Sequence, residues 1–103
     1  MDMHAVNELR LFIENDRDLY KQQFMPIIEN IKRKLSRGIY DPGKAPKLWL
    51  YLVDNGAKKY HKLFNSGGKW HHVFPIEVRR KIADEMALDY IDVIKKDRVL
   101  NLL

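Results

Sequence analysis

The chain has 103 residues, of which 46% are hydrophobic and 32% charged, and its formal net charge is +5. This length and balance predict a single folded domain over 1–103 and exclude a disordered chain. The absence of cysteine excludes a disulfide framework and any thiolate metal site. No uncharged apolar stretch approaches the ~20 residues of a membrane-spanning helix, and no secretory signal opens the sequence, so we expect a cytoplasmic protein without a membrane partner.

The first third of the chain has the period of an α-helix, because its apolar residues recur at spacings of three, four and seven. Asn15 and Asp16 look like a cap where this pattern is interrupted, and Pro26 removes a backbone donor from the middle of it. The pattern therefore predicts one helix over about 3–14 and a second over about 17–37 that is kinked or restarted at Pro26. Gly38 supplies the left-handed residue that commonly ends a helix.

A turn at 41–43 precedes the third predicted helix, and Pro46 places its regular start near Lys47. From there to residue 64, apolar residues occupy one arc of the helix and most charged residues the opposite arc. Gly56 lies in the middle of the apolar arc. Its missing side chain costs up to ~1 kcal/mol of helix propensity but lets another helix approach closely. We therefore predict a close helix crossing at Gly56.

The residues 65–68 are a loop by composition, and Pro75 is well placed as the first residue of a fourth helix that ends near Lys96. We expect a flexible C-terminal end at about 97–103. No segment shows the alternation of a strand, so the fold class is all-α, a compact bundle of four to five helices without a sheet. The side chains expected to be mostly buried are Leu9, Phe12, Ile13, Phe24, Ile28, Ile31, Leu52, Val53, Tyr60, Ile82 and Met86.

The positive charge is concentrated in the centre of the chain. Residues 39–72 hold six basic and two acidic side chains, whereas the segments before and after are nearly balanced. Basic residues around an aromatic side chain are typical of nucleic-acid contact. The candidate residues are Lys58, Lys59, Lys62, Lys69, Trp70, His71, His72, Arg79 and Arg80. Since lysines neutralise phosphates without reading bases, we expect weak, salt-sensitive binding that is indifferent to sequence, with Trp70 available to stack on a base.

Helix-end electrostatics offer a second interpretation of the same charges. Cations in the last turn of a helix complement its dipole, at typically ~0.3 to 1 kcal/mol each. Lys58, Lys59 and Lys62 are in such a place, so no ligand is needed to explain them. Trp70 then folds back to cover the edge of the core.

Catalytic and metal-binding patterns are absent from the sequence. The nucleophile candidates are two serines, Ser36 and Ser66, and neither has a neighbouring base or an elbow motif. His71 and His72 are adjacent and follow His61 by ten residues, which matches no zinc pattern. We therefore predict a protein that is not an enzyme and needs no metal or cofactor.

Apolar residues in excess of one small core suggest an interface. Leu50 and Tyr51 extend the apolar surface of the third helix toward its polar side, and Leu100 and Leu103 stand near the terminus. Such a surplus is typical of a subunit interface and favours a protein interaction module, a homo-oligomer or an adaptor, as the alternative function. A tail that packs across its own bundle explains the last two residues equally well.

Three short phrases carry a resemblance. The segments 40–42 (Tyr-Asp-Pro), 50–54 (Leu-Tyr-Leu-Val-Asp) and 70–75 (Trp-His-His-Val-Phe-Pro) resemble those of short uncharacterised reading frames in phage and other mobile elements. The resemblance covers about the central half of the chain. It implies an accessory protein in a setting rich in nucleic acid and transfers no functional residue.

Overall fold

The computed structural model describes residues 1–64 and 67–102, with side chains up to residue 97. Within these residues every regular element is helical, which confirms the predicted all-α bundle. No helix among them has the length and apolar character needed to cross a membrane. The elements are α1 (Met3–Asn15), α2 (Arg17–Leu19), the π-helical turn η1 (Tyr20–Phe24), α3 (Met25–Ser36), α4 (Ala45–Phe64), α5 (Trp70–Val73) and α6 (Ile76–Leu102).

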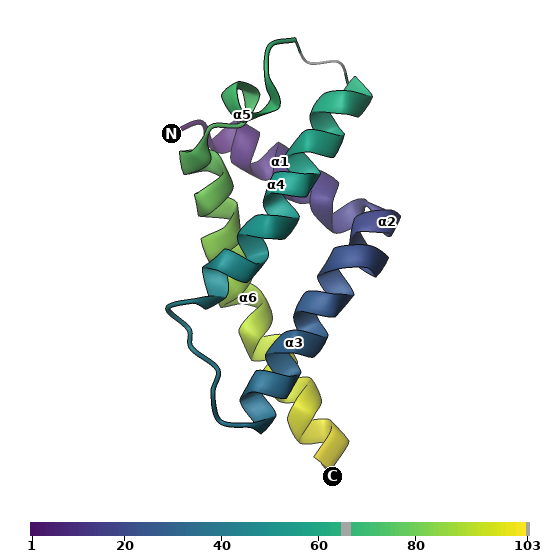
Figure 1. Cartoon of the computed structure of the whole chain (residues 1–103), viewed down its shortest axis with the longest axis vertical. Coiled ribbons are helices and arrows are strands. Elements are labelled where there is room, and N and C mark those ends of the chain that lie inside the picture. Colours follow the sequence, from purple (N-terminus) through teal and green to yellow (C-terminus); the bar gives the residue numbers. More distant parts are fainter. Residues whose placement is uncertain (65–66, 103) are drawn as a thin grey trace.

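The long helices α4 and α6 run antiparallel and form the centre of the bundle (Figure 1). In this view α1 crosses α4, and the continuous run of α2, η1 and α3 descends beside them to meet the lower part of α6. The molecule is elongated, with extents of 50 × 26 × 18 Å. All eleven side chains predicted for the core are buried or half-buried, the half-buried ones being Phe12, Phe24 and Tyr60.

Gly56 lies where α1 crosses α4. A Cβ placed on Gly56 would overlap Cγ1 of Ile13 and lie 2.8 Å from its Cδ1. Ile13 is itself buried, so its side chain fills the space beside Gly56 and cannot move away from an added methyl group. The predicted close crossing at Gly56 is confirmed, and its partner is α1.

The predicted break at Pro26 takes the form of a wide helical turn. The N–H of Met25 bonds the carbonyl of Tyr20, five residues back, which is the spacing of a π-helix. Pro26 then follows directly after this wide turn, as the second residue of α3. The chain therefore stays helical through the proline. Gly38 has φ +69° and ends α3 as predicted.

The element boundaries differ from the predicted ones at three places. Helix α4 begins at Ala45 with Pro46 inside its first turn, because proline is accommodated there. Helix α6 begins directly after Pro75 and continues to Leu102, past the predicted end near Lys96. The short helix α5 occupies a segment for which no helix was predicted. The side chains of most of the segment expected to be flexible, 97–103, lie outside the described residues.

Asp16 performs two tasks at the junction of α1 and α2. Its Oδ1 accepts a hydrogen bond from the backbone N–H of Leu19 at 2.9 Å, which is the predicted cap. Its Oδ2 also lies 2.8 Å from Nζ of Lys59 on α4. Partial burial opposes ionisation, but the bonds from Lys59 and Leu19 lower the pKa of Asp16 below its ordinary value.

The Asp16→Ala variant should lose about 1 to 2 kcal/mol of stability at neutral pH, about 1 from the cap and the rest from the partly exposed ion pair. The folded pKa lies below the unfolded value, so this contribution is present above pH ~4 and is lost as the pH falls through the folded pKa. Urea unfolding at neutral and acid pH measures both effects. The Asp16→Asn variant, which retains a capping oxygen, should recover the cap but not the ion pair. Equal stability of Asp16→Ala and wild type at neutral pH would contradict this account.

Candidate nucleic-acid interface

The last turns of α4, the short α5 and the first turn of α6 meet at one end of the molecule (Figure 1). Trp70 of α5 stands between the other two elements. Nζ of Lys58 lies 5.0 Å from the centroid of its ring, and Cζ of Arg79 lies 4.7 Å from it. Both are cation–π distances. The fold therefore brings together the three sequence segments from which the predicted basic patch was assembled.

Arg79 belongs to the interior of this end. Its side chain is almost fully buried, at 8% exposed for the whole residue. Its Nε donates to the carbonyl of Phe74 at 2.9 Å, and its Nη1 donates to Asp54 of α4 at 2.6 Å. A buried guanidinium needs such partners, and here they join α4 to α6. Arg79 is thus a structural contact, and a phosphate would have to displace Asp54 to reach it.

Lys59 is also engaged within the molecule. Its Nζ lies 2.8 Å from Asp16 and 3.5 Å from Asp18, on the side of α4 that faces α2. This ion pair raises the pKa of Lys59, with the hydrogen bond to Asp16 as the largest cause. Its charge is therefore already compensated.

Trp70 packs against the core and is half-buried. Cations of α4 and α6 lie against its ring. This arrangement agrees with the second interpretation of the sequence, in which Trp70 folds back to cover the edge of the core. The expected use of Trp70 as a stacking platform for a base would require Lys58 or Arg79 to move aside. Its position is better suited to holding α5 against α4 and α6.

Four cations of the predicted patch remain at this surface with exposed side chains, and together they are called the cationic end here. They are Lys58, Lys62, Lys69 and Arg80. No carboxylate among the described residues lies within ion-pairing distance of any of them. They come from α4, the loop before α5, and α6, so the surface exists only in the folded chain.

The histidines lie at the same end. His71 and His72 are exposed, with ring centroids 4.5 Å apart. The pKa of His71 is lowered, first by partial desolvation and then by the positive charges of His72, Lys69 and Arg79. Nε2 of His61 donates to the carbonyl of Gly68 at 2.8 Å, which ties the loop before α5 to α4. Among the described residues no three His, Asp or Glu side chains are grouped so that they could hold a metal ion.

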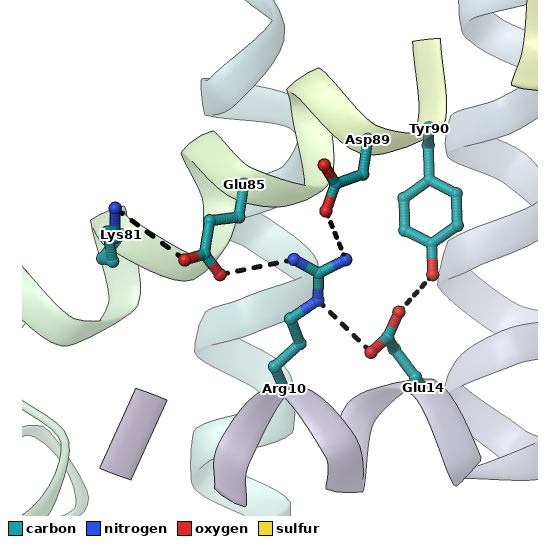
Figure 2. Close-up of polar contacts among 6 residues, drawn as sticks. All are labelled: Arg10, Glu14, Lys81, Glu85, Asp89 and Tyr90. Atoms are coloured by element: carbon teal, nitrogen blue, oxygen red, sulfur yellow. Dashed lines mark hydrogen bonds and ion pairs between the residues drawn. The ribbon is translucent and has the colours of Figure 1, made fainter. Parts of the chain in front are cut away.

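A second polar cluster lies between α1 and α6, and sequence reasoning missed it. Figure 2 shows its members, Arg10, Glu14, Lys81, Glu85, Asp89 and Tyr90. The guanidinium of Arg10 lies 3.2 Å from Glu14, 3.3 Å from Glu85 and 2.8 Å from Asp89. The signal was available in the sequence, because Arg10 follows Val6 by four residues on the buried arc of α1, where a charge needs partners.

This cluster has the character of a structural clamp. Each carboxylate has a cationic partner, and the hydroxyl of Tyr90 donates to Glu14. Burial, followed by the hydrogen bond to Glu14, raises the pKa of Tyr90 to about 12. The Tyr90 hydroxyl therefore stays protonated at neutral pH and acts as a hydrogen-bond donor to Glu14. The cluster fixes the crossing of α1 and α6.

The predicted interface residues divide between two regions. Tyr51 is 72% exposed and, with half-buried Leu50, lines a shallow hollow of about 300 Å³ on α4. Leu100 and Leu103 lie outside the residues whose side chains are described. A larger groove of about 510 Å³ runs between α6 and the segment that leads into the first turn of α4. Its lining residues are Tyr40, Pro42, Pro46, Asp84, Ala87, Leu88, Ile91 and Lys95.

Two surfaces of the described residues thus have chemistry that suits a ligand: the cationic end suits a phosphate, and this groove suits apolar side chains. The start of α6 contributes to the cationic end, and the middle of α6 lines the groove. Comparison of the chain with protein-family models, with curated proteins and with solved structures found no match.

Proposed function

We propose that this protein is a small non-catalytic binder of nucleic acid that contacts the phosphate backbone through the cationic end. The observation that carries the proposal is that three separate segments meet around Trp70 and carry four exposed cations without carboxylate partners among the described residues. These cations are Lys58, Lys62, Lys69 and Arg80. At the same end of the molecule, Lys59 and Arg79 are instead paired with carboxylates of the protein itself. An uncompensated group of cations attracts polyanions.

Binding of this kind is weak and indifferent to sequence. Lysine is a point charge that neutralises a phosphate, whereas base reading uses the planar fork of arginine or the amides of Asn and Gln. Three of the four cations are lysines, and the guanidinium of Arg79 is already bonded to Asp54. About four phosphate contacts on duplex DNA give a log–log slope of affinity against salt of roughly −3 to −4.

A binding titration against single- and double-stranded DNA and RNA at two salt concentrations tests the proposal. The variant carrying Lys58→Ala, Lys62→Ala and Lys69→Ala should bind more weakly, and its salt slope should flatten to roughly −1, the value for the one remaining contact. The Lys59→Ala variant should keep the wild-type slope, because Lys59 is held by Asp16 and Asp18.

The matched control removes the same charge from the opposite end of the molecule, with Arg33→Ala, Lys34→Ala and Arg37→Ala at the end of α3. This control should retain the wild-type slope. Equal losses in the two triple variants would mean that net charge alone attracts the polyanion, and the cationic end would then have no special role. Absence of binding at low salt would also contradict the proposal.

A further inference from the structure

The groove on α6 carries an ordered set of side chains. Asp84, Leu88, Ile91 and Lys95 are spaced by four, three and four residues, so they form one stripe along the helix. Along this stripe a carboxylate comes first, two apolar side chains follow, and an ammonium comes last. Leu88 is 72% exposed, which is costly for a leucine that nothing covers. The stripe therefore has a negative end, a positive end and an apolar centre in which Leu88 is uncovered.

This order makes the stripe complementary to itself. If a second α6 lies antiparallel with the partner's Lys95 opposite Asp84, the partner's Ile91 falls opposite Leu88. The reverse contacts, Lys95 with the partner's Asp84 and Ile91 with the partner's Leu88, follow from the same two-fold axis. All four contacts share one register because the two pairs of positions have the same midpoint, between Asp89 and Tyr90. Such reciprocity is the defining property of an isologous interface.

We infer that two copies of the chain associate through this stripe, with their α6 helices antiparallel. Leu88 of each copy enters the groove of the other, whose far wall is formed by Tyr40, Pro42 and Pro46. The occupant is a second copy and not a nucleic acid, because the groove is apolar and the carboxylate of Asp84 repels phosphate. An unrelated apolar segment would cover Leu88. It would not explain why opposite charges, Asp84 and Lys95, stand at the two ends of the stripe.

The association is independent of the proposed nucleic-acid binding. Lys58, Lys62 and Lys69 of the cationic end belong to other parts of the chain, and only Arg80, one turn before Asp84 on the same face of α6, borders the stripe. With α6 antiparallel, the two cationic ends lie at opposite ends of the dimer. The stripe covers about 17 Å of helix, a short contact that predicts weak, concentration-dependent association.

Charge exchange tests the register with the full chain and no nucleic acid, by sedimentation equilibrium over a range of protein concentrations. Wild type should dimerise as concentration rises. The Asp84→Lys variant and the Lys95→Asp variant should each stay monomeric, because like charges then face each other at both ends of the stripe. An equimolar mixture of the two variants should form heterodimers, since opposite charges face again in both pairs. The chain carrying both substitutions should dimerise like wild type.

Matched variants on the same helix separate the interface from general effects of mutation. Leu88→Ala should raise the dimer dissociation constant roughly tenfold or more, because it removes both symmetric contacts. Val93→Ala, an equally simple truncation of an exposed residue on another side of α6, should leave the constant unchanged. Lys96→Asp is the corresponding control for Lys95→Asp, because it reverses the neighbouring charge and should leave the dissociation constant unchanged. Circular dichroism confirms that each variant keeps its helix content.

Three results would overturn the inference. The first is a wild-type chain that stays monomeric at every concentration. The second is a dimer whose dissociation constant is unchanged by either single charge reversal. The third is a mixture of the two reversed variants that stays monomeric. The last result would be decisive, because misfolding of either variant is excluded by its circular dichroism. None of these results bears on the salt slope of nucleic-acid binding, so the two proposals fail separately.

Discussion

Replacing Gly56 with alanine should destabilise the wild-type protein but stabilise a chain in which Ile13 is already alanine. In the wild type the added Cβ overlaps Ile13, and overpacking of a core costs about 1 to 3 kcal/mol. The gain in helix propensity is only about 1 kcal/mol, so a net loss of up to about 2 kcal/mol is expected. Removing the Ile13 side chain costs about 2 to 4 kcal/mol by itself, but it clears the space, and only the propensity gain then remains.

Urea unfolding of the wild type, both single variants and the double variant measures the coupling between these positions, which should reach about 2 kcal/mol. The Ile28→Ala background serves as the control, because Ile28 is buried on α3 and is not among the atoms near Gly56. There the cost of Gly56→Ala should be the same as in the wild type. A Gly56→Ala variant that is more stable than wild type would contradict the close crossing of α1 and α4.

The Arg10→Met variant should lose about 2 to 3 kcal/mol, a value reduced from the cost of breaking a fully buried pair because the Arg10 side chain is 20% exposed. The change leaves Glu14, Glu85 and Asp89 facing one another without their shared cation. Thermal or urea unfolding at neutral pH measures this loss.

Arg17→Met is the matched control, because Arg17 is an exposed arginine of the neighbouring α2. It should change stability by no more than about 0.5 kcal/mol. Arg10→Lys should fall between the two, since an ammonium keeps the charge but lacks the planar fork that reaches three carboxylates. If Arg10→Met cost no more than Arg17→Met, the clamp between α1 and α6 would have no energetic role.

The features that the sequence predicted are those decided by neighbouring residues. The helical period located the core, and Gly56 in an apolar arc indicated a close crossing. Asp16 could be identified as a cap because capping joins residues three apart, and Gly38 as a helix end because few residues adopt a positive φ.

The features that could not be predicted depend on how the helices cross. Lys59 has the same local setting as Lys58, and only the position of α2 pairs it with Asp16. Arg79 similarly resembles Arg80 in sequence, yet one is buried against Asp54 and the other is exposed. The groove has walls from α6 and from the segment that leads into the first turn of α4, which are far apart in the chain, so its lining had no local signal. Four of the nine residues predicted to contact nucleic acid form the cationic end, whereas Lys59, Trp70 and Arg79 are engaged within the molecule.

Phosphate binding at the cationic end is tested most directly by following backbone amide resonances while a short single-stranded oligonucleotide is added at low salt. The shifts should concentrate at Lys58, Lys62, Lys69 and Arg80 and disappear when salt is raised. Leu88 in the groove should remain unaffected when the protein is dilute enough to be monomeric. Shifts spread over basic residues at both ends of the molecule, or no shifts at all at low salt, would contradict the proposed function.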